Sequence, residues 1–173
     1  DLMDYVPATW VRAGGMFYKQ AKLSASGCPV ISVVHGSSTA GGAYMPGMSD
    51  YVVMVRDQAT AFLAGPPLVR AATGEIAEAE ELGGTNMHAS ISGLTEYVAE
   101  DDPQALAICR DIVGRLNWQK RLAPTMEHTW DEPAYDIDEL CGIVPTEYQK
   151  PYDVREVIAR LVDGSDFLEF KAE

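Results

Sequence analysis

The sequence predicts an α/β fold, because short β-branched strands alternate with amphipathic helices and Gly- or Pro-rich turns separate them. Residues 29–34, Pro-Val-Ile-Ser-Val-Val, have the composition and length of a central buried strand. Residues 51–55 form a second β-branched run, and residues 60–63 predict a third strand. Strands that alternate with helices imply crossover connections between them.

Helical periodicity places the remaining elements. Residues 16–25 predict a helix that ends at Gly27. A helix of about two turns is expected to end near Met48, with Pro46 in its first turn, because proline deeper in a helix removes a backbone hydrogen bond. Short helices are predicted over residues 67–72 and 77–82.

The clearest helix begins after Asp102, the expected N-cap, with Pro103 as its first residue. Its apolar residues recur at the spacing of one helix face: Ala105, Ile108, Cys109, Ile112, Val113 and Leu116. Residues 117–150 lose all periodicity and are interpreted as a linker. Residues 153–162 then predict a second amphipathic helix.

Composition excludes several classes of function. The chain has 173 residues, with 13 Lys and Arg against 26 Asp and Glu, for a net charge of −13. No cluster of four or more basic residues exists, so binding to nucleic acid or to an anionic membrane is disfavoured. Three cysteines without CxxC spacing indicate a reducing compartment and argue against zinc. With no signal peptide or membrane-spanning run, we expect the cytoplasm, or the mitochondrial matrix in a eukaryote, and no metal site.

One stretch differs from the rest of this acidic chain. Residues 23–49 contain no Lys, Arg, Asp or Glu, but six Ser and five Gly. We expect this uncharged stretch to be buried or to face a pocket.

The strongest candidate site lies inside this stretch, where the strand over residues 29–34 leads to Ser-Ser-Thr-Ala-Gly-Gly. Gly41 and Gly42 lack a Cβ, so a ligand can approach their backbone closely. The first N–H groups of a helix have no partner within it and can bind an oxygen that becomes negative during a reaction. An ordinary tight turn, with glycines for packing, remains the alternative, because the motif is neither a P-loop nor a dinucleotide fingerprint.

A second turn of this kind follows residues 60–63, at Ala64, Gly65 and Pro66, and the two turns are expected to line one pocket. Tyr44, on the short helix, either points its hydroxyl at a ligand or packs in the core.

Conventional catalytic residues are poorly arranged. Ser37 and Ser38 lie near His35, but alternate residues of a strand face opposite sides and no G-x-S-x-G elbow exists. We therefore interpret His35 as a buried, hydrogen-bonded histidine at a strand end and Asp50 as a capping or loop acid. His88 and His128 lie outside any ligand-spaced cluster.

Several segments together resemble the carboxyltransferase (β) subunit of biotin-dependent acyl-CoA carboxylases, the group of the propionyl-, methylcrotonyl-, geranyl- and acetyl-CoA enzymes. The resemblance covers residues 16–171, whereas residues 1–13 match poorly. It is carried by residues 17–24, 33–44, 64–69, 72–75, 81–84, 152–158 and 163–165.

The resemblance implies a partial crotonase-like fold of ββα turns. Residues 1–117 would be the C-terminal part of the first carboxyltransferase domain, residues 118–150 a linker, and residues 151–173 the start of the second domain. It also implies a hexamer, with each active site formed between subunits, and both ends of this chain are expected to be cut.

The resemblance further implies carboxyl transfer from carboxybiotin to the α carbon, or the vinylogous γ carbon, of an acyl-CoA. Biotin would be carried by a partner biotin carboxylase and carrier subunit. Gly41 and Gly42 would donate N–H groups to the thioester oxygen. The substrate-binding residues would be Thr39, Ala40, Ala43, Tyr44, Ala64, Gly65 and Pro66.

Three other readings stay open. A biotin-dependent acyl-CoA decarboxylase subunit has the same fold and runs the reaction in reverse. A crotonase-type hydratase or isomerase would need carboxylates after the glycines, and residues 43–49 contain none. A non-catalytic assembly module is the third, because the chain would carry only half of one active site.

Overall fold

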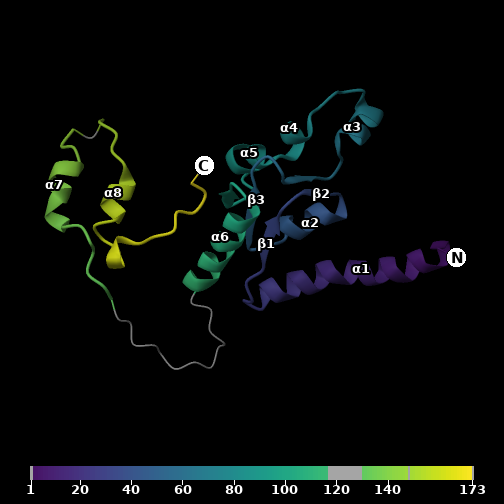
Figure 1. The fold of residues 1–173 in the computed structure, drawn as a ribbon, viewed down its shortest axis with the longest axis horizontal. Coiled ribbons are helices and arrows are strands. Elements are labelled where there is room, and N and C mark those ends of the chain that lie inside the picture. The colour runs from purple at the N-terminus through teal and green to yellow at the C-terminus, as the bar shows by residue number, and fades with distance from the viewer. Residues whose placement is uncertain (1, 117–129, 148, 173) are drawn as a thin grey trace. The chain divides into compact units, whose positions relative to one another are not determined.

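The chain divides into two compact units, of which the first contains residues 1–118 and 170–173 and the second residues 119–169 (Figure 1). The computed structural model describes residues 2–116, 130–147 and 149–172, with side chains from residue 14 onward.

Two parallel sheets form the first unit. One has three strands in the order β1-β3-β5, and the other pairs β2 with β4. The parallel pairings confirm an α/β fold with crossover connections. The strands are β1 (Ile31–Val34), β2 (Ser37–Thr39), β3 (Tyr51–Val55), β4 (Thr60–Phe62) and β5 (Tyr97–Ala99).

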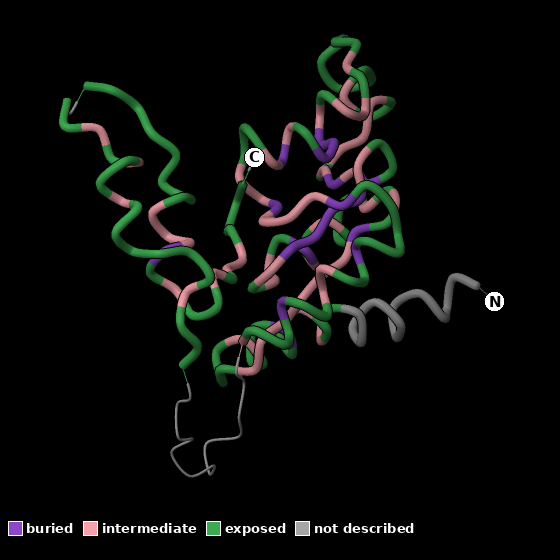
Figure 2. Tube along the Cα trace, turned by 60° about the vertical axis from the view of Figure 1, so that its left-hand side comes forward, coloured by how far each residue is buried: buried purple, intermediate pink, exposed green. Residues whose placement is uncertain are grey.

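The core of the first unit lies on β3, the middle strand of the larger sheet (Figure 2). Val52, Val53, Met54 and Val55 are each at most 2% exposed. Four consecutive buried residues show that both faces of this strand are covered, as expected for a central parallel strand.

Helices surround these sheets. Among the described residues, no helix is long and apolar enough to cross a lipid bilayer. The helices of the first unit are α1 (Leu2–Ala25), α2 (Gly41–Gly47), α3 (Pro66–Thr73), α4 (Ala79–Gly83), α5 (Thr85–Met87), the π-helix η1 (His88–Ser92) and α6 (Asp102–Arg115).

Helix α6 packs on the three-stranded sheet with Ala105 and Ile112 of its predicted apolar face buried, but Val113, which was predicted on the same face, is exposed. The expected N-cap is wrong by one residue. The side chain of Asp101, not that of Asp102, accepts the Gln104 N–H at 2.8 Å. Asp102 already lies in the helix, so its carboxylate is available for another contact.

Helix α2 has the predicted length of about two turns, but the predicted position of Pro46 is wrong. The helix begins at Gly41, so Pro46 lies near its end rather than in its first turn. The Pro46 nitrogen cannot donate to the carbonyl one turn earlier. This loss is tolerated because the helix ends at Gly47, and because the proline ring is buried.

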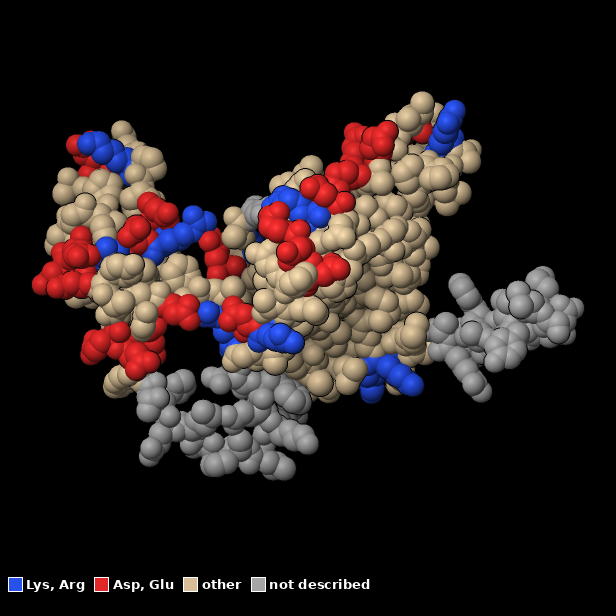
Figure 3. All heavy atoms as spheres, viewed as in Figure 1, with Lys and Arg blue, Asp and Glu red and all other residues tan. Residues whose placement is uncertain are grey.

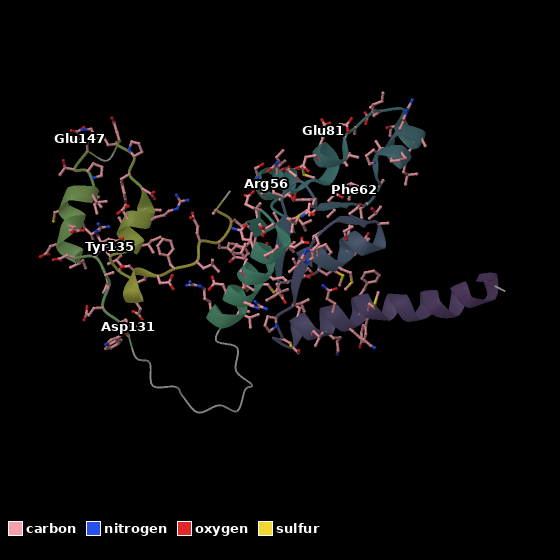
Figure 4. The ribbon with its side chains drawn as sticks, viewed as in Figure 1. Arg56, Phe62, Glu81, Asp131, Tyr135 and Glu147 are labelled. Atoms are coloured by element: carbon pink, nitrogen blue, oxygen red, sulfur yellow. The ribbon has the colours of Figure 1, made fainter. Side chains whose placement is uncertain are left out.

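The second unit contains short helical segments around one nearly buried arginine. Arg160 is paired with Glu139 at 2.7 Å and with Glu156 at 2.9 Å, and it lies 5.0 Å from the Tyr135 ring, which Figure 4 labels. Its hydrogen bonds to Glu139 are the main reason that the pKa of Arg160 is raised. The segments are η2 (Ile137–Glu139), α7 (Leu140–Ile143), α8 (Val154–Ile158) and η3 (Asp163–Ser165).

Both η2 and α7 lie within residues 118–150, which the sequence suggested were a linker. The division into carboxyltransferase domains at residues 117 and 150 stays a prediction.

Candidate active site

The turn between β2 and α2 has an unusual backbone at Ala40, with φ 52° and ψ −119°. Residues other than glycine rarely adopt this combination of φ and ψ, and holding one there costs about 1–3 kcal/mol of conformational strain. The Ala40 N–H donates to the Phe62 carbonyl at 3.0 Å, and the Ala43 N–H donates to the Ala40 carbonyl at 3.0 Å. These bonds fix the turn against the end of β4, beside the Phe62 labelled in Figure 4.

Gly41 and Gly42 are the first two residues of α2, and both are exposed. Within the described part of the chain, their N–H groups have no hydrogen-bond acceptor. The turn therefore presents two adjacent main-chain donors that the fold itself does not use, as the sequence suggested. Their assignment as oxyanion donors stays a prediction.

A cavity of about 400 Å³ opens beside Gly42. The residues around it come from β1, β2, the link between them and α2: Ser32, Val33, Val34, His35, Gly36, Ser37, Ser38, Gly42, Met45 and Pro46. Much of the uncharged stretch therefore lines a cavity, as expected, although Gly41 and Gly42 are exposed rather than buried.

The second turn lies at the same end of the smaller sheet. Thr39, the last residue of β2, is paired with Phe62, the last residue of β4, so both strands end at one edge. Ala64 and Gly65 follow, and α3 begins at Pro66. The two predicted turns are thus neighbours, but none of the second turn's residues lines the 400 Å³ cavity.

The remaining predicted substrate contacts are placed differently from one another. The ring of Tyr44 is half-exposed and packs edge-on against Phe17 of α1, with 6.0 Å between the ring centres. Thr39 is exposed and its hydroxyl lies 3.4 Å from that of Ser37, whereas Ala43 is half-buried. The alternative that Tyr44 packs in the core is therefore wrong, and its contact with a substrate stays a prediction.

The titratable residues near the turn are mostly engaged. Asp50 accepts hydrogen bonds from the Ser24 hydroxyl at 2.6 Å and from the Val30 N–H at 2.8 Å, which fits a loop acid that orders the backbone. His88 is buried, with Nε2 2.7 Å from the Ala61 carbonyl and Nδ1 2.6 Å from the Ser92 hydroxyl. No cluster of three or more metal-binding side chains occurs in the described residues.

Two residues of this region were not assigned to the site from sequence, since Ser38 was considered only as a nucleophile and Asp102 only as a helix cap. Asp102 reaches His35, with 2.8 Å between Asp102 Oδ1 and His35 Nδ1, so a carboxylate orients an imidazole that lines the cavity. Ser38 lines the same cavity and lies 3.4 Å from the position that a Cβ on Gly42 would occupy. Sequence spacing gave no sign of the first pair, whose members are 67 residues apart.

Charge is unevenly distributed over the first unit. Figure 3 shows a broad face without Lys, Arg, Asp or Glu over the region of β2 and α2, whereas acidic side chains gather near α4. The turn that carries Gly41 and Gly42 therefore lies on a face with neutral side chains.

A family model described as "Carboxyl transferase domain" matches residues 4–173. The chain belongs to this family. Membership confirms the resemblance that the sequence motifs indicated.

Curated relatives support the same conclusion. The chain is 54% identical over 162 residues to a "probable biotin-dependent acyl-coenzyme A carboxylase beta2 subunit" of Mycobacterium tuberculosis, with 94% of this chain and 30% of the relative covered. It is also 54% identical over 158 residues to the mitochondrial methylcrotonoyl-CoA carboxylase beta chain of Dictyostelium discoideum, covering 91% of this chain and 27% of that one. The chain thus spans about 30% of the length of these relatives.

Solved structures give the same fold. The β subunit of Pseudomonas aeruginosa geranyl-CoA carboxylase is similar with a TM-score of 0.60 at 52% identity, covering 92% of this chain and 29% of that one. The transcarboxylase 12S structure is similar with a TM-score of 0.74 at 37% identity, covering 92% and 30%. The carboxyl transferase chain therefore has part of the crotonase-like α/β fold of these β subunits.

Proposed function

We propose that this chain is part of the carboxyltransferase component of a biotin-dependent acyl-CoA carboxylase. The reaction is transfer of a carboxyl group from carboxybiotin to the α carbon, or the vinylogous γ carbon, of an acyl-CoA. The observation that carries the proposal is the pair of N–H groups at Gly41 and Gly42, unused by the described fold and next to an open cavity.

The role of the two glycines follows from the chemistry of the substrate. Removing a proton from the α carbon of a thioester places negative charge on its oxygen. Two fixed N–H donors stabilise that oxygen without having to reorganise, and the loss of one such donor typically costs about 10²–10³ in rate. The strained Ala40 backbone supports this role, since such strain tends to occur at functional sites.

Biotin, when bound on its carrier, supplies the carboxyl group and the base that takes the substrate proton. The residues of this chain fit the thioester half of such a site, with neutral donors and room for an oxygen atom. No described residue is assigned to biotin itself, and we place the biotin-binding half on sequence beyond this chain or on another subunit.

We propose biotin carboxylase and the biotin carrier as partners, and a homo-oligomer as the assembly. The transcarboxylase 12S relative is described as a hexamer with methylmalonyl-coenzyme A bound in a hydrolysed form. Because the chain spans about 30% of such subunits, we expect it to have no carboxylase turnover alone. It would act within a complete subunit, by which we mean this chain joined to the remaining carboxyltransferase sequence.

We place the protein in the cytoplasm, or in the mitochondrial matrix of a eukaryote. The free cysteines suit a reducing compartment, and relatives from Dictyostelium discoideum and Arabidopsis thaliana are named as mitochondrial.

We also propose that residues 1–117 belong to the first carboxyltransferase domain, that residues 118–150 are a linker and that residues 151–173 begin the second domain.

The test is transfer of ¹⁴C from labelled bicarbonate. The complete subunit is assembled with biotin carboxylase, biotinylated carrier and MgATP, and is offered short, branched and long acyl-CoAs. We expect acid-stable label in at least one acyl-CoA product, and none without the carrier. Failure with every acyl-CoA, in an assembly whose carrier is carboxylated, would contradict the proposed function.

A further inference from the structure

Ser38 occupies the middle of β2, directly before the turn that carries the two glycines. The hydroxyls of the residues on either side of it, Ser37 and Thr39, lie 3.4 Å from each other. Ser38 is half-buried and lines the cavity beside Gly42.

The cavity is lined by three serines, and their hydroxyl groups differ in what they already bind. The Ser32 hydroxyl is 2.6 Å from that of Ser49, which itself donates to the Met45 carbonyl at 2.9 Å. The Ser37 hydroxyl faces Thr39. Among the residues that the structure describes, the Ser38 hydroxyl has no hydrogen-bond partner.

The position of this hydroxyl relates it to the proposed oxyanion donors. A Cβ built on Gly42 would lie 3.4 Å from Ser38 Oγ, and no other described side chain outside the neighbouring residues lies within 4 Å of that position. Gly42 and Ser38 also line the same cavity, so an oxygen atom that accepts the Gly42 N–H there can lie within reach of the Ser38 hydroxyl, which can rotate to donate to it.

From this geometry we infer that the Ser38 hydroxyl is a third hydrogen-bond donor to the thioester oxygen of the acyl-CoA. The inference rests on the proposed function, and adds to the two main-chain donors a side chain that touches the substrate. No covalent step is involved, because the hydroxyl keeps its proton and donates a hydrogen bond as negative charge grows on the oxygen. A donor that matters most when the oxygen is charged affects kcat more than KM.

The test uses the complete subunit assembled with biotin carboxylase and biotinylated carrier, with an acyl-CoA that the wild-type assembly carboxylates. Ser38→Ala removes the hydroxyl, and Ser38→Thr keeps it on a side chain that suits a strand. Ser90→Ala is the control, since it removes an exposed hydroxyl that donates to the Asn86 carbonyl at 2.8 Å and that does not line the cavity. Thermal unfolding of each variant is measured alongside activity.

We expect Ser38→Ala to lower kcat by about 10-fold or more, with KM for the acyl-CoA changed by less than about 2-fold. Ser38→Thr should restore most of the activity, and Ser90→Ala should stay within about 2-fold of wild type. Unchanged kcat in Ser38→Ala would overturn the inference, as would a rise in KM alone. If Ser38→Ala is fully active while Gly42→Val is inactive in that same experiment, the proposed function stands and the inference about Ser38 fails. If the wild-type assembly is inactive with every acyl-CoA, the proposed function and the inference both fail.

Discussion

The Nδ1 atom of His35 lies 2.8 Å from Oδ1 of Asp102, so the end of β1 is linked to the first turn of α6. Both side chains are substantially exposed, at 41% for His35 and 54% for Asp102. The sequence-based view of His35 as hydrogen-bonded is confirmed, but the view that it is buried is wrong. Its strand ends at Val34, which is buried, and the next residue already faces solvent.

We expect His35→Gln to change the free energy of unfolding by less than about 1 kcal/mol, because exposed pairs of this kind contribute little. Asp102→Asn should behave similarly, since Asp101 and not Asp102 caps the helix. Urea denaturation of both variants tests this. A loss above about 2 kcal/mol in either would show that the link between β1 and α6 is a major part of the fold.

Gly42→Val is expected to abolish carboxyl transfer in the complete subunit while leaving thermal unfolding nearly unchanged. The new side chain would begin 3.4 Å from Ser38 Oγ and extend into the space where the thioester oxygen is proposed to bind. Gly47→Ala, on the same helix and with open space at its Cβ position, is the control and should keep its activity. Full activity of Gly42→Val would rule out the oxyanion assignment.

Gly83→Ala should destabilise the first unit by about 2–4 kcal/mol. A Cβ at Gly83 would lie 2.2 Å from the carbonyl oxygen of Ala61, a buried residue of β4, so the backbone of the strand or of α4 must shift. At an exposed position of helix α6, Gly114→Ala meets nothing within 4 Å and should stabilise by about 0.5–1 kcal/mol. Equal effects of the two variants in chemical denaturation would contradict this steric explanation.

Tyr97 should make the protein less stable at alkaline pH. Burial is the main cause that raises the pKa of Tyr97 above its usual 10.0, and Tyr51 and Glu96 add to it. The folded state therefore holds the phenol proton more tightly than the unfolded chain. The stability this contributes is complete below about pH 10 and is lost as the pH rises through the higher folded value.

Tyr97→Phe cannot lose a proton, so its free energy of unfolding should fall less than that of wild type above about pH 10. Denaturant titrations at several alkaline pH values measure this, with Tyr18→Phe, an exposed residue of α1, as the control. An identical alkaline decline in wild type and Tyr97→Phe would show that Tyr97 is not responsible.

The strands rich in β-branched residues could be predicted from sequence, because their apolar composition itself indicates burial. Residues 52–55 of β3 are indeed buried. The short strand β5 could not. Its three residues lie between Glu96 and Glu100, and only pairing with β3 makes them a strand. Strand β2 was read as part of a turn for a similar reason, since Ser-Ser-Thr becomes a strand by pairing with β4.

The candidate site likewise combines features that local sequence indicates with features that depend on distant residues. The position of Gly41 and Gly42 at a helix start follows from local sequence, whereas the importance of Ser38 does not. Its hydroxyl stands out only because Ser32 is satisfied by Ser49, a contact across 17 residues that no local pattern indicates. The positive φ of Ala40 was equally hidden, since glycine adopts a positive φ more readily than alanine does.

The absence of charged side chains from residues 23–49 has a consequence for how the proposed acyl-CoA substrate would arrive at the turn. Dissolved salt weakens the attraction between fixed charges, and this turn has none of its own to be screened. Long-range steering of a polyanionic thioester toward the turn must then come from cations elsewhere in the assembly. Ionic strength should consequently alter the rate of encounter while leaving the hydrogen bonds made at the turn almost untouched.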